Sequence, residues 1–159
     1  MKICLLADGE SIHTIRWCKH FFDLGHEIHL ISFKKTQIEN IKVHYVDSGV
    51  ISVEGGNWSI LFQFRKIKKI ISQIQPDVVH ALYATSYGVV GALSGFHPYI
   101  VTPLGTDVLI SPQGSFIYRI LLRYIFKKAD LITSIAPHMR DVMIKLGASS
   151  SKIDRKSVV

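Results

Sequence analysis

The sequence predicts an α/β fold, with a parallel sheet and helices on both of its faces. Short apolar runs rich in β-branched residues alternate with segments of helical period, and several of these runs stop abruptly in a polar turn. Such alternation is typical of parallel strands joined by crossover helices. The 159 residues, of which 48% are hydrophobic, are sufficient for the core of one domain.

Six strands are expected, at residues 2–7, 27–33, 42–46, 77–81, 99–102 and 130–134. The first contains the apolar run Cys4-Leu5-Leu6-Ala7, which Asp8 ends at once. A run this short has the pattern of a buried strand and is too short for a signal peptide or a membrane span.

Five helices are expected, four between these strands and one after the last, at residues 12–24, 58–75, 86–94, 115–128 and 137–146. In the second, one side carries apolar residues at helical spacing and should face the sheet: Ile60, Phe64, Ile67, Ile71 and Ile74. Right-handed crossovers through such helices give a Rossmann-like sheet with the first strand near its centre.

Four of the strands run into polar loops. These loops follow Ala7, Val79, Thr102 and Thr133. Because open α/β sheets bind ligands at the carboxyl ends of their strands, we expect the four loops to converge on one cleft.

Five segments also carry a family resemblance. In chain order they are MKICLLADGESIHTIRW, GHEIHLISF, PDVVHALYATSYG, VTPLGTDVL and ADLITSIAPHMRDVMIKLGA. Together they resemble the N-terminal domain of retaining GT-B glycosyltransferases of family 4, over residues 1–148. The resemblance implies one half of a GT-B fold. It also implies that a sugar passes from a nucleotide-sugar to an acceptor hydroxyl, with retention of configuration and usually without a metal.

The first loop offers backbone and side-chain donors to a ligand. Gly9 lets a ligand approach the backbone, and Ser11 can cap the helix that follows. His13 and Thr14 lie beside the free N–H groups at the start of this helix, which attract phosphate or sugar oxygens. Many members of the resembled family carry two glycines where this chain has Asp8-Gly9-Glu10.

The other three loops add further substrate-binding candidates. His80 is expected to end its strand and turn a ring nitrogen into the cleft, while Tyr83 and Tyr87 could stack on a sugar ring. Gly105 permits an unusual backbone angle, and Thr106 supplies a hydroxyl. The fourth loop contributes Ser134.

Asp107 is the candidate catalytic residue. A carboxylate near a sugar can accept hydroxyl hydrogen bonds or take a proton from the attacking oxygen. Capping the next short turn is the alternative role. Many members of the resembled family have His-Asp where this chain has Thr106-Asp107, so the sequence offers no catalytic histidine at this position.

The net charge of +7 and the pI of about 9.5 favour an anionic partner, although they are equally compatible with ordinary solubility. Trp58, Phe62, Arg65 and Lys69 lie on the side of their helix opposite the apolar stripe. This interleaving of aromatic and basic residues is typical of a contact with an anionic membrane, and also of a solvated basic face. Arg119, Arg123 and Lys127 form a second basic row.

Other function classes are disfavoured. The chain has no G-x-G-x-x-G after its first strand and no P-loop motif, and its histidines do not have the spacing of a metal site. A nucleic-acid reader motif is also absent. We therefore expect no metal and no cofactor besides the nucleotide-sugar cosubstrate. Cys4 and Cys18 have the pattern of reduced buried thiols, which indicates a cytoplasmic protein, with peripheral attachment to the inner face of the membrane as an option.

Residues 149–159 are expected to lie outside the core as a truncated tail. In the resembled family, a strand and a linker lead from this position into the nucleotide-sugar domain. The last residues, 154–159, read DRKSVV, which matches the translation of a common sequencing adapter and favours read-through. A natural tail with a coincidental match is the alternative.

The sequence thus predicts the acceptor-binding half of a retaining glycosyltransferase, inactive without a donor domain. Two other functions stay open. One is a non-catalytic module that binds a glycan or a lipid, and the other is half of a GT-B-fold sugar epimerase.

Overall fold

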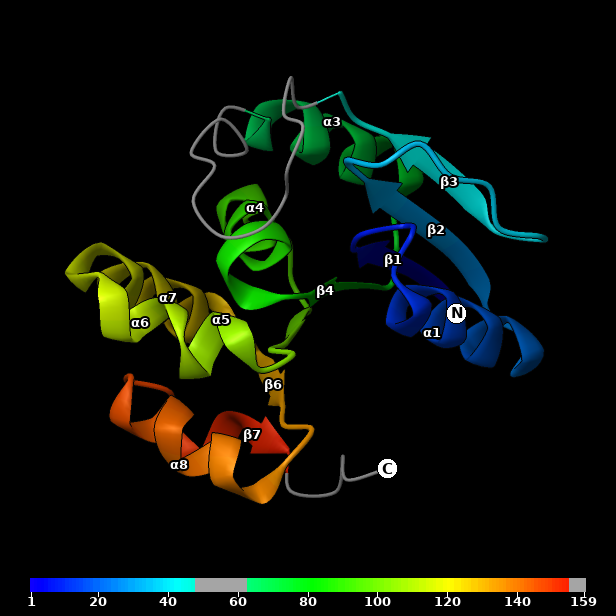
Figure 1. The fold of residues 1–159 in the computed structure, drawn as a ribbon. Helices are drawn as coiled ribbons and strands as arrows, with labels where there is room; N and C mark the ends of the chain where they lie inside the picture. Colours follow the sequence, from blue (N-terminus) through cyan, green and yellow to red (C-terminus); the bar gives the residue numbers. More distant parts are fainter. Residues whose placement is uncertain (48–62, 155–159) are drawn as a thin grey trace.

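The computed structural model describes residues 1–47 and 63–154. In these residues a parallel sheet has seven strands in the order β3-β2-β1-β4-β5-β6-β7. The strands are β1 Lys2–Leu6, β2 Glu27–Ser32, β3 Lys42–Tyr45, β4 Val78–Leu82, β5 Tyr99–Thr102, β6 Leu131–Thr133 and β7 Ile153–Asp154. The predicted parallel α/β sheet is confirmed, and β1 lies near its middle (Figure 1).

The longer helices are α1 Ile12–Asp23, α3 Phe64–Ile74, α7 Phe116–Lys128 and α8 Pro137–Lys145. A wide helical turn, η1 Ala84–Gly88, leads directly into α4 Val89–Ser94, so this helical segment begins two residues earlier than predicted. Three short elements were not predicted: α5 Thr106–Leu109, α6 Ser111–Gly114 and η2 Ser150–Lys152. Of the predicted helix at 58–75, residues 58–62 lie outside the described residues.

Two apolar clusters, one on each face of the sheet, form the core. The α1 face contains Cys18 of α1 packed with Leu5 and Leu30 of the central strands. The other face is larger and is covered by α3, α4, α7 and α8, as the buried side chains of Ile71 and Leu122 illustrate. Figure 1 shows α1 on one side of the molecule and α3, α4 and α7 on the other. The prediction of helices on both faces is therefore confirmed.

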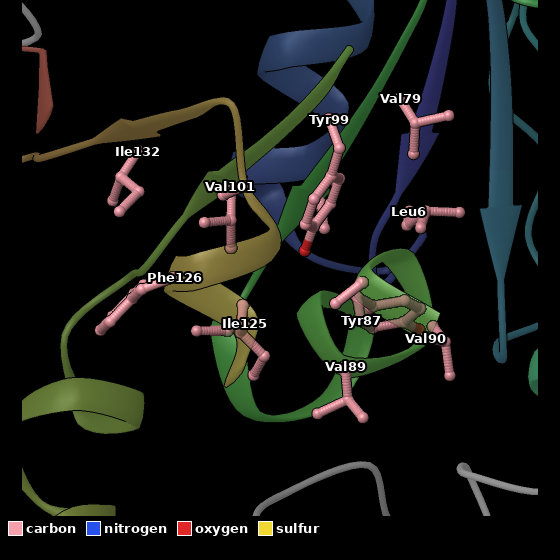
Figure 2. Packing of buried hydrophobic residues seen from close by; sticks show 14 of the residues in the cluster. Leu6, Val79, Tyr87, Val89, Val90, Tyr99, Val101, Ile125, Phe126 and Ile132 are labelled. Carbon is pink, nitrogen blue, oxygen red and sulfur yellow. The ribbon is translucent and has the colours of Figure 1, made fainter. Parts of the chain in front are cut away.

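The junction between β5 and α4 shows how tightly this larger cluster packs (Figure 2). Tyr99 points from β5 toward the helical turn, and its hydroxyl donates to the carbonyl of Gly88 at 2.7 Å. A Cβ added at Gly91 would lie 2.6 Å from the Tyr99 ring, so only glycine fits at this point of α4. Tyr87 is also buried here and stacks on Phe33. The expectation that Tyr87 holds a sugar ring is therefore wrong.

The strand β7 corrects the prediction that the chain leaves the core at Ser149. Ile153 pairs with Ile132 of β6 and is only 5% exposed. Lys152 secures the approach to this strand, because its ammonium group donates to the carbonyls of Lys127 and Ala129. Ser149 to Asp154 therefore belong to the folded domain, and residues 155–159 lie outside the described residues.

Candidate functional site

The parallel arrangement brings the predicted loops to one edge of the sheet. Because all seven strands run in the same direction, the loops after β1, β4, β5 and β6 emerge at the same carboxyl edge. Gly9, Tyr83, Gly105 and Ser134 follow these strands. The sequence therefore placed the four loops on the correct edge, although several of their side chains lie differently from what was expected.

In the loop after β1, Gly9 contacts protein instead of leaving a gap for a ligand. Its N–H donates to Ser32 Oγ at 2.9 Å, and the N–H of Lys34 donates to the same oxygen at 3.0 Å. A Cβ at Gly9 would collide with the side chain of Thr36. Gly9 is therefore required by the packing of this loop against the one that follows β2.

The helix α1 begins directly after this loop. Ser11 takes the N-cap position, but its side chain makes no capping hydrogen bond, contrary to the expectation. Thr14 is buried at 2% exposure, whereas the side chain of His13 is exposed. Of the candidates on this helix, His13 is the one that can reach a ligand from solvent.

Tyr83 and Thr106 form a direct contact between the loops after β4 and β5. The Tyr83 hydroxyl lies 2.9 Å from Thr106 Oγ1, and Thr106 is exposed. Tyr83 holds a positive φ of 79°, an unusual angle for a bulky residue, and tertiary contacts have to maintain it. Tyr83 combines a strained backbone with an accessible hydroxyl partner. It is therefore the strongest candidate for a ligand contact at the carboxyl edge of the sheet.

Asp107 is a second, buried connection between the loops after β4 and β5. Its carboxylate accepts hydrogen bonds from three backbone N–H groups, those of Ala84 at 2.6 Å, Gly105 at 2.9 Å and Leu104 at 3.1 Å. Burial raises the pKa of this carboxyl group, and these hydrogen bonds oppose the rise. With 0% of its surface exposed, Asp107 fixes the backbone that carries Tyr83 and Thr106.

His80 departs from the expectation. It lies in the middle of β4 and faces α1, where its ring meets Trp17 edge-on with centroids 5.0 Å apart. Its Nε2 lies 2.6 Å from Thr102 Oγ1, which in turn bonds to Thr133. Burial lowers the pKa of His80 from 6.5 to about 4, so the ring is neutral near pH 7. The prediction that this ring points into the cleft is wrong, because strand alternation directs it to the α1 face.

Ser134 is also largely enclosed. It is 5% exposed, and its hydroxyl donates to the carbonyl of Ala136 at 2.8 Å, at the turn into α8. Two further hydroxyls at this edge, those of Thr85 and Ser86, are buried without a hydrogen-bond partner among the described residues. An unpaired buried hydroxyl costs about 1–3 kcal/mol, which marks η1 as a place where packing alone does not satisfy the polar groups.

The basic stripe predicted on the second helix is described only in part. Trp58 and Phe62 lie outside the described residues, whereas Arg65 and Lys69 are exposed on α3. The guanidinium of Arg65 sits over the ring of Phe64, 5.8 Å from its centroid. Within residues 1–47 and 63–154, no helix is both long and apolar enough to cross a bilayer.

Sequence reasoning missed a pair of histidines on β2 and the edge strand β3. His29 Nδ1 lies 2.9 Å from His44 Nε2, and Glu27 accepts hydrogen bonds from His29 and Lys42. These two hydrogen bonds lower the pKa of the Glu27 carboxyl group to about 2, and the bond from Lys42 has the larger effect. The pair could be recognised only from the parallel register of β2 and β3, which the sequence pattern alone does not provide. In the part of the chain that the structure describes, no group of three or more acidic, histidine or cysteine side chains could hold a metal ion.

Comparisons with known proteins agree with this architecture. The family described as Glycosyl transferase 4-like matches residues 2–136, and no curated protein matches the chain. Sucrose-phosphate synthase from Thermosynechococcus elongatus superposes with a TM-score of 0.74 at 12% identity, over 97% of this chain and 87% of that chain.

Two longer proteins share the same fold. HepE from Anabaena, solved in complex with UDP-glucose, gives a TM-score of 0.65 at 17% identity, over 97% of this chain and 43% of that one. UDP-N-acetylglucosamine 2-epimerase from Rickettsia bellii gives 0.62 at 14% identity, over 96% and 43%. The present chain thus spans less than half the length of these two proteins.

The family match extends from β1 through the loop after β6 and so includes all four loops of the carboxyl edge. Together with the seven-stranded parallel sheet, it shows that this chain belongs to the glycosyl transferase 4-like family and forms an N-terminal domain of the GT-B type.

Proposed function

We propose that this domain is the acceptor-binding half of a retaining glycosyltransferase. The enzyme would transfer a sugar from a nucleotide-sugar to a hydroxyl of a glycan or a lipid-linked acceptor. The observation that carries this proposal is the family match over residues 2–136, which spans every loop of the carboxyl edge. The complex of HepE with UDP-glucose supports a nucleotide-sugar as donor. A second domain, corresponding to the part of HepE that this chain does not cover, would hold the donor.

Within this proposal, the hydroxyl pair of Tyr83 and Thr106 contacts the acceptor. The pair is supported by its position after β4 and β5 and by the exposure of Thr106. His13, exposed on the first turn of α1, adds a ring nitrogen from the neighbouring loop. The shape of this surface would be supported by residues whose described contacts are with protein. These are Gly9, Ser11, Thr14, His80 and Ser134.

We assign Asp107 a positioning role. A general base has to come within hydrogen-bond distance of the hydroxyl that it deprotonates. Both oxygens of Asp107 already accept hydrogen bonds from backbone N–H groups, and the residue is fully buried. It would act through Thr106 and Tyr83, by keeping their loops at a fixed separation.

The test uses the chain extended by its donor domain. A transferase releases nucleotide diphosphate only when an acceptor is present, so acceptor-dependent release of UDP from UDP-sugars is the expected result. Thr106→Val should lower kcat/KM by roughly tenfold, because about 1.4 kcal/mol is typical of one lost hydrogen bond. Ser72→Ala, an exposed hydroxyl on α3, is the matched control and should have no effect. Transfer by the 159-residue chain alone would contradict the half-enzyme proposal.

A sugar epimerase is the second candidate, because the structural neighbours include UDP-N-acetylglucosamine 2-epimerases. The same extended protein distinguishes the two activities. An epimerase converts UDP-N-acetylglucosamine without any acceptor and yields a product whose epimerised sugar is still joined to UDP, which nuclear magnetic resonance of the product detects. Binding of a glycan without turnover of either kind would instead favour a non-catalytic module.

The cysteines support a reducing compartment for this protein. Cys4 and Cys18 are both free and buried, and burial raises the pKa of each thiol to about 12. Such thiols react slowly because little thiolate is present. We propose that the enzyme works in the cytoplasm, where such thiols stay reduced. Mass spectrometry after alkylation of the native protein should find both residues unmodified.

A further inference from the structure

Large apolar side chains are exposed together at the start of α7 and on the short helices before it. Phe116 is 73% exposed, Ile117 is 55% exposed and Ile120 is 54% exposed. Ile110, at the junction of α5 and α6, is 64% exposed. The short helix α6 and the start of α7 are held together, because Arg119 Nε donates to the carbonyl of Pro112 at 2.8 Å. Figure 1 shows α5, α6 and α7 grouped on the side of the domain away from α1.

Four of the exposed residues form one continuous row along α7. Phe116, Ile120, Arg123 and Lys127 recur at i, i+4, i+7 and i+11, which places them on the same face of the helix. The opposite face is buried in the core through Leu122, Ile125 and Phe126. The outward face, which we call the α7 outer face, is therefore apolar over its first turns and cationic over its last turns.

The segment that carries this face has basic but no acidic side chains. Between Asp107 and Asp130 the sequence has no acidic residue, whereas it has Arg119, Arg123, Lys127 and Lys128. A pocket of about 360 Å³ beside α7 is lined by the basic side chains of Arg119, Arg123 and Lys145. An apolar row flanked by cations complements a surface with an apolar interior and an anionic rim.

We propose that the α7 outer face, together with Ile110, docks the domain on an anionic lipid bilayer. Phe116, Ile117 and Ile120 enter the headgroup region, while Arg123 and Lys127 meet the lipid phosphates. Pairing of this face with a second copy of the chain is disfavoured, because a symmetric contact would bring the two basic rows together. The proposal goes beyond sugar transfer and does not depend on it.

The experiment measures binding of the chain to vesicles by cosedimentation. Vesicles that contain phosphatidylglycerol should bind the protein, and pure phosphatidylcholine vesicles should bind it roughly tenfold less. The double variant Phe116→Ser/Ile120→Ser should bind the anionic vesicles at least about tenfold less tightly, because two large apolar side chains no longer enter the interface. Both residues are exposed, so the variant is expected to fold, and circular dichroism checks this.

The matched control is Ile12→Ser/Phe22→Ser, which removes two exposed apolar residues from α1 on the other side of the domain. It should bind like the unaltered chain. The proposal is overturned if the Phe116/Ile120 variant binds as tightly as the control, or if the unaltered chain ignores anionic vesicles. It is also overturned if sedimentation equilibrium shows a dimer that the Phe116/Ile120 variant dissolves, since the face would then pair with a second copy.

Discussion

The helices α3 and α7 cover the same face of the sheet and are both rich in basic residues, yet they present different surfaces to solvent. On α3 the apolar residues Ile67, Ile71 and Ile74 are all buried, and the exposed side is basic. On α7 the apolar residues exceed what the core covers, so that Phe116, Ile117 and Ile120 remain exposed beside the cations. A basic row alone is a solvated face, whereas a basic row beside exposed apolar residues has the composition of an interface.

The largest expected difference concerns stability. Ile71→Ala on α3 should lower the free energy of unfolding by about 2–5 kcal/mol, because it leaves a cavity in the core. Ile120→Ala on α7 removes the same atoms from an exposed position and should change that free energy by less than about 0.5 kcal/mol. Urea denaturation followed by circular dichroism measures both values. Equal losses would show that Ile120 is covered in solution.

Lowering the pH should separate folding from lipid binding. Burial lowers the pKa of His80 from 6.5 to about 4 in the folded state, so the unfolded chain takes up this proton first. Stability should therefore fall as the pH drops from about 6.5 to about 4, by at most about 3 kcal/mol. Neither α3 nor α7 contains a histidine or an acidic residue, so binding to phosphatidylglycerol vesicles should stay constant while the protein remains folded.

The control for this pH effect is His80→Gln, which keeps a neutral polar group beside Thr102. Subtracting its pH profile from that of the unaltered chain cancels all other titrating groups, including His44, whose pKa burial also lowers. If the two profiles of unfolding free energy coincide, His80 is not the source of the acid sensitivity.

Charge removal should distinguish the two basic rows. Arg123→Gln/Lys127→Gln on α7 should weaken binding to anionic vesicles by about 2 kcal/mol, or roughly thirtyfold, since each cation near the membrane contributes about 1 kcal/mol. Arg65→Gln/Lys69→Gln on α3 should weaken it by less than about threefold, because no large apolar side chain is exposed on the described turns of α3. The expectation from sequence, that the stripe on α3 contacts the membrane, requires the reverse order.

A tryptophan reporter is expected to give the smallest effect of these experiments, but it locates the membrane contact most closely. Tryptophan introduced by Phe116→Trp should shift its emission to shorter wavelength when anionic vesicles are added, because its ring enters a less polar environment. Lys66→Trp, at an exposed position on α3, should show no shift after the signal of Trp17 and Trp58 is subtracted. A shift at position 66 alone would move the contact to α3.

Much of the fold could be predicted because its signals are local. Strand runs such as residues 99–102 and the helix at 115–128 follow from periodicity, and the parallel order follows from their alternation. The position of the loops at one carboxyl edge follows from the same alternation. Misassigned boundaries, such as the start of η1 at Ala84, depend on contacts with residues far along the chain.

The sequence by itself determined the parallel α/β architecture, the family and the edge on which the loops of the candidate site meet. Tertiary structure decided that His80 packs against Trp17, that Asp107 fixes two loops, that Ile153 belongs to the core and that Phe116 is exposed among the described residues. The physical reason is the separation along the chain of the residues that determine each property. Periodicity is set by neighbouring residues, whereas the burial and pairing of a polar or apolar side chain are set by residues that only the fold brings beside it.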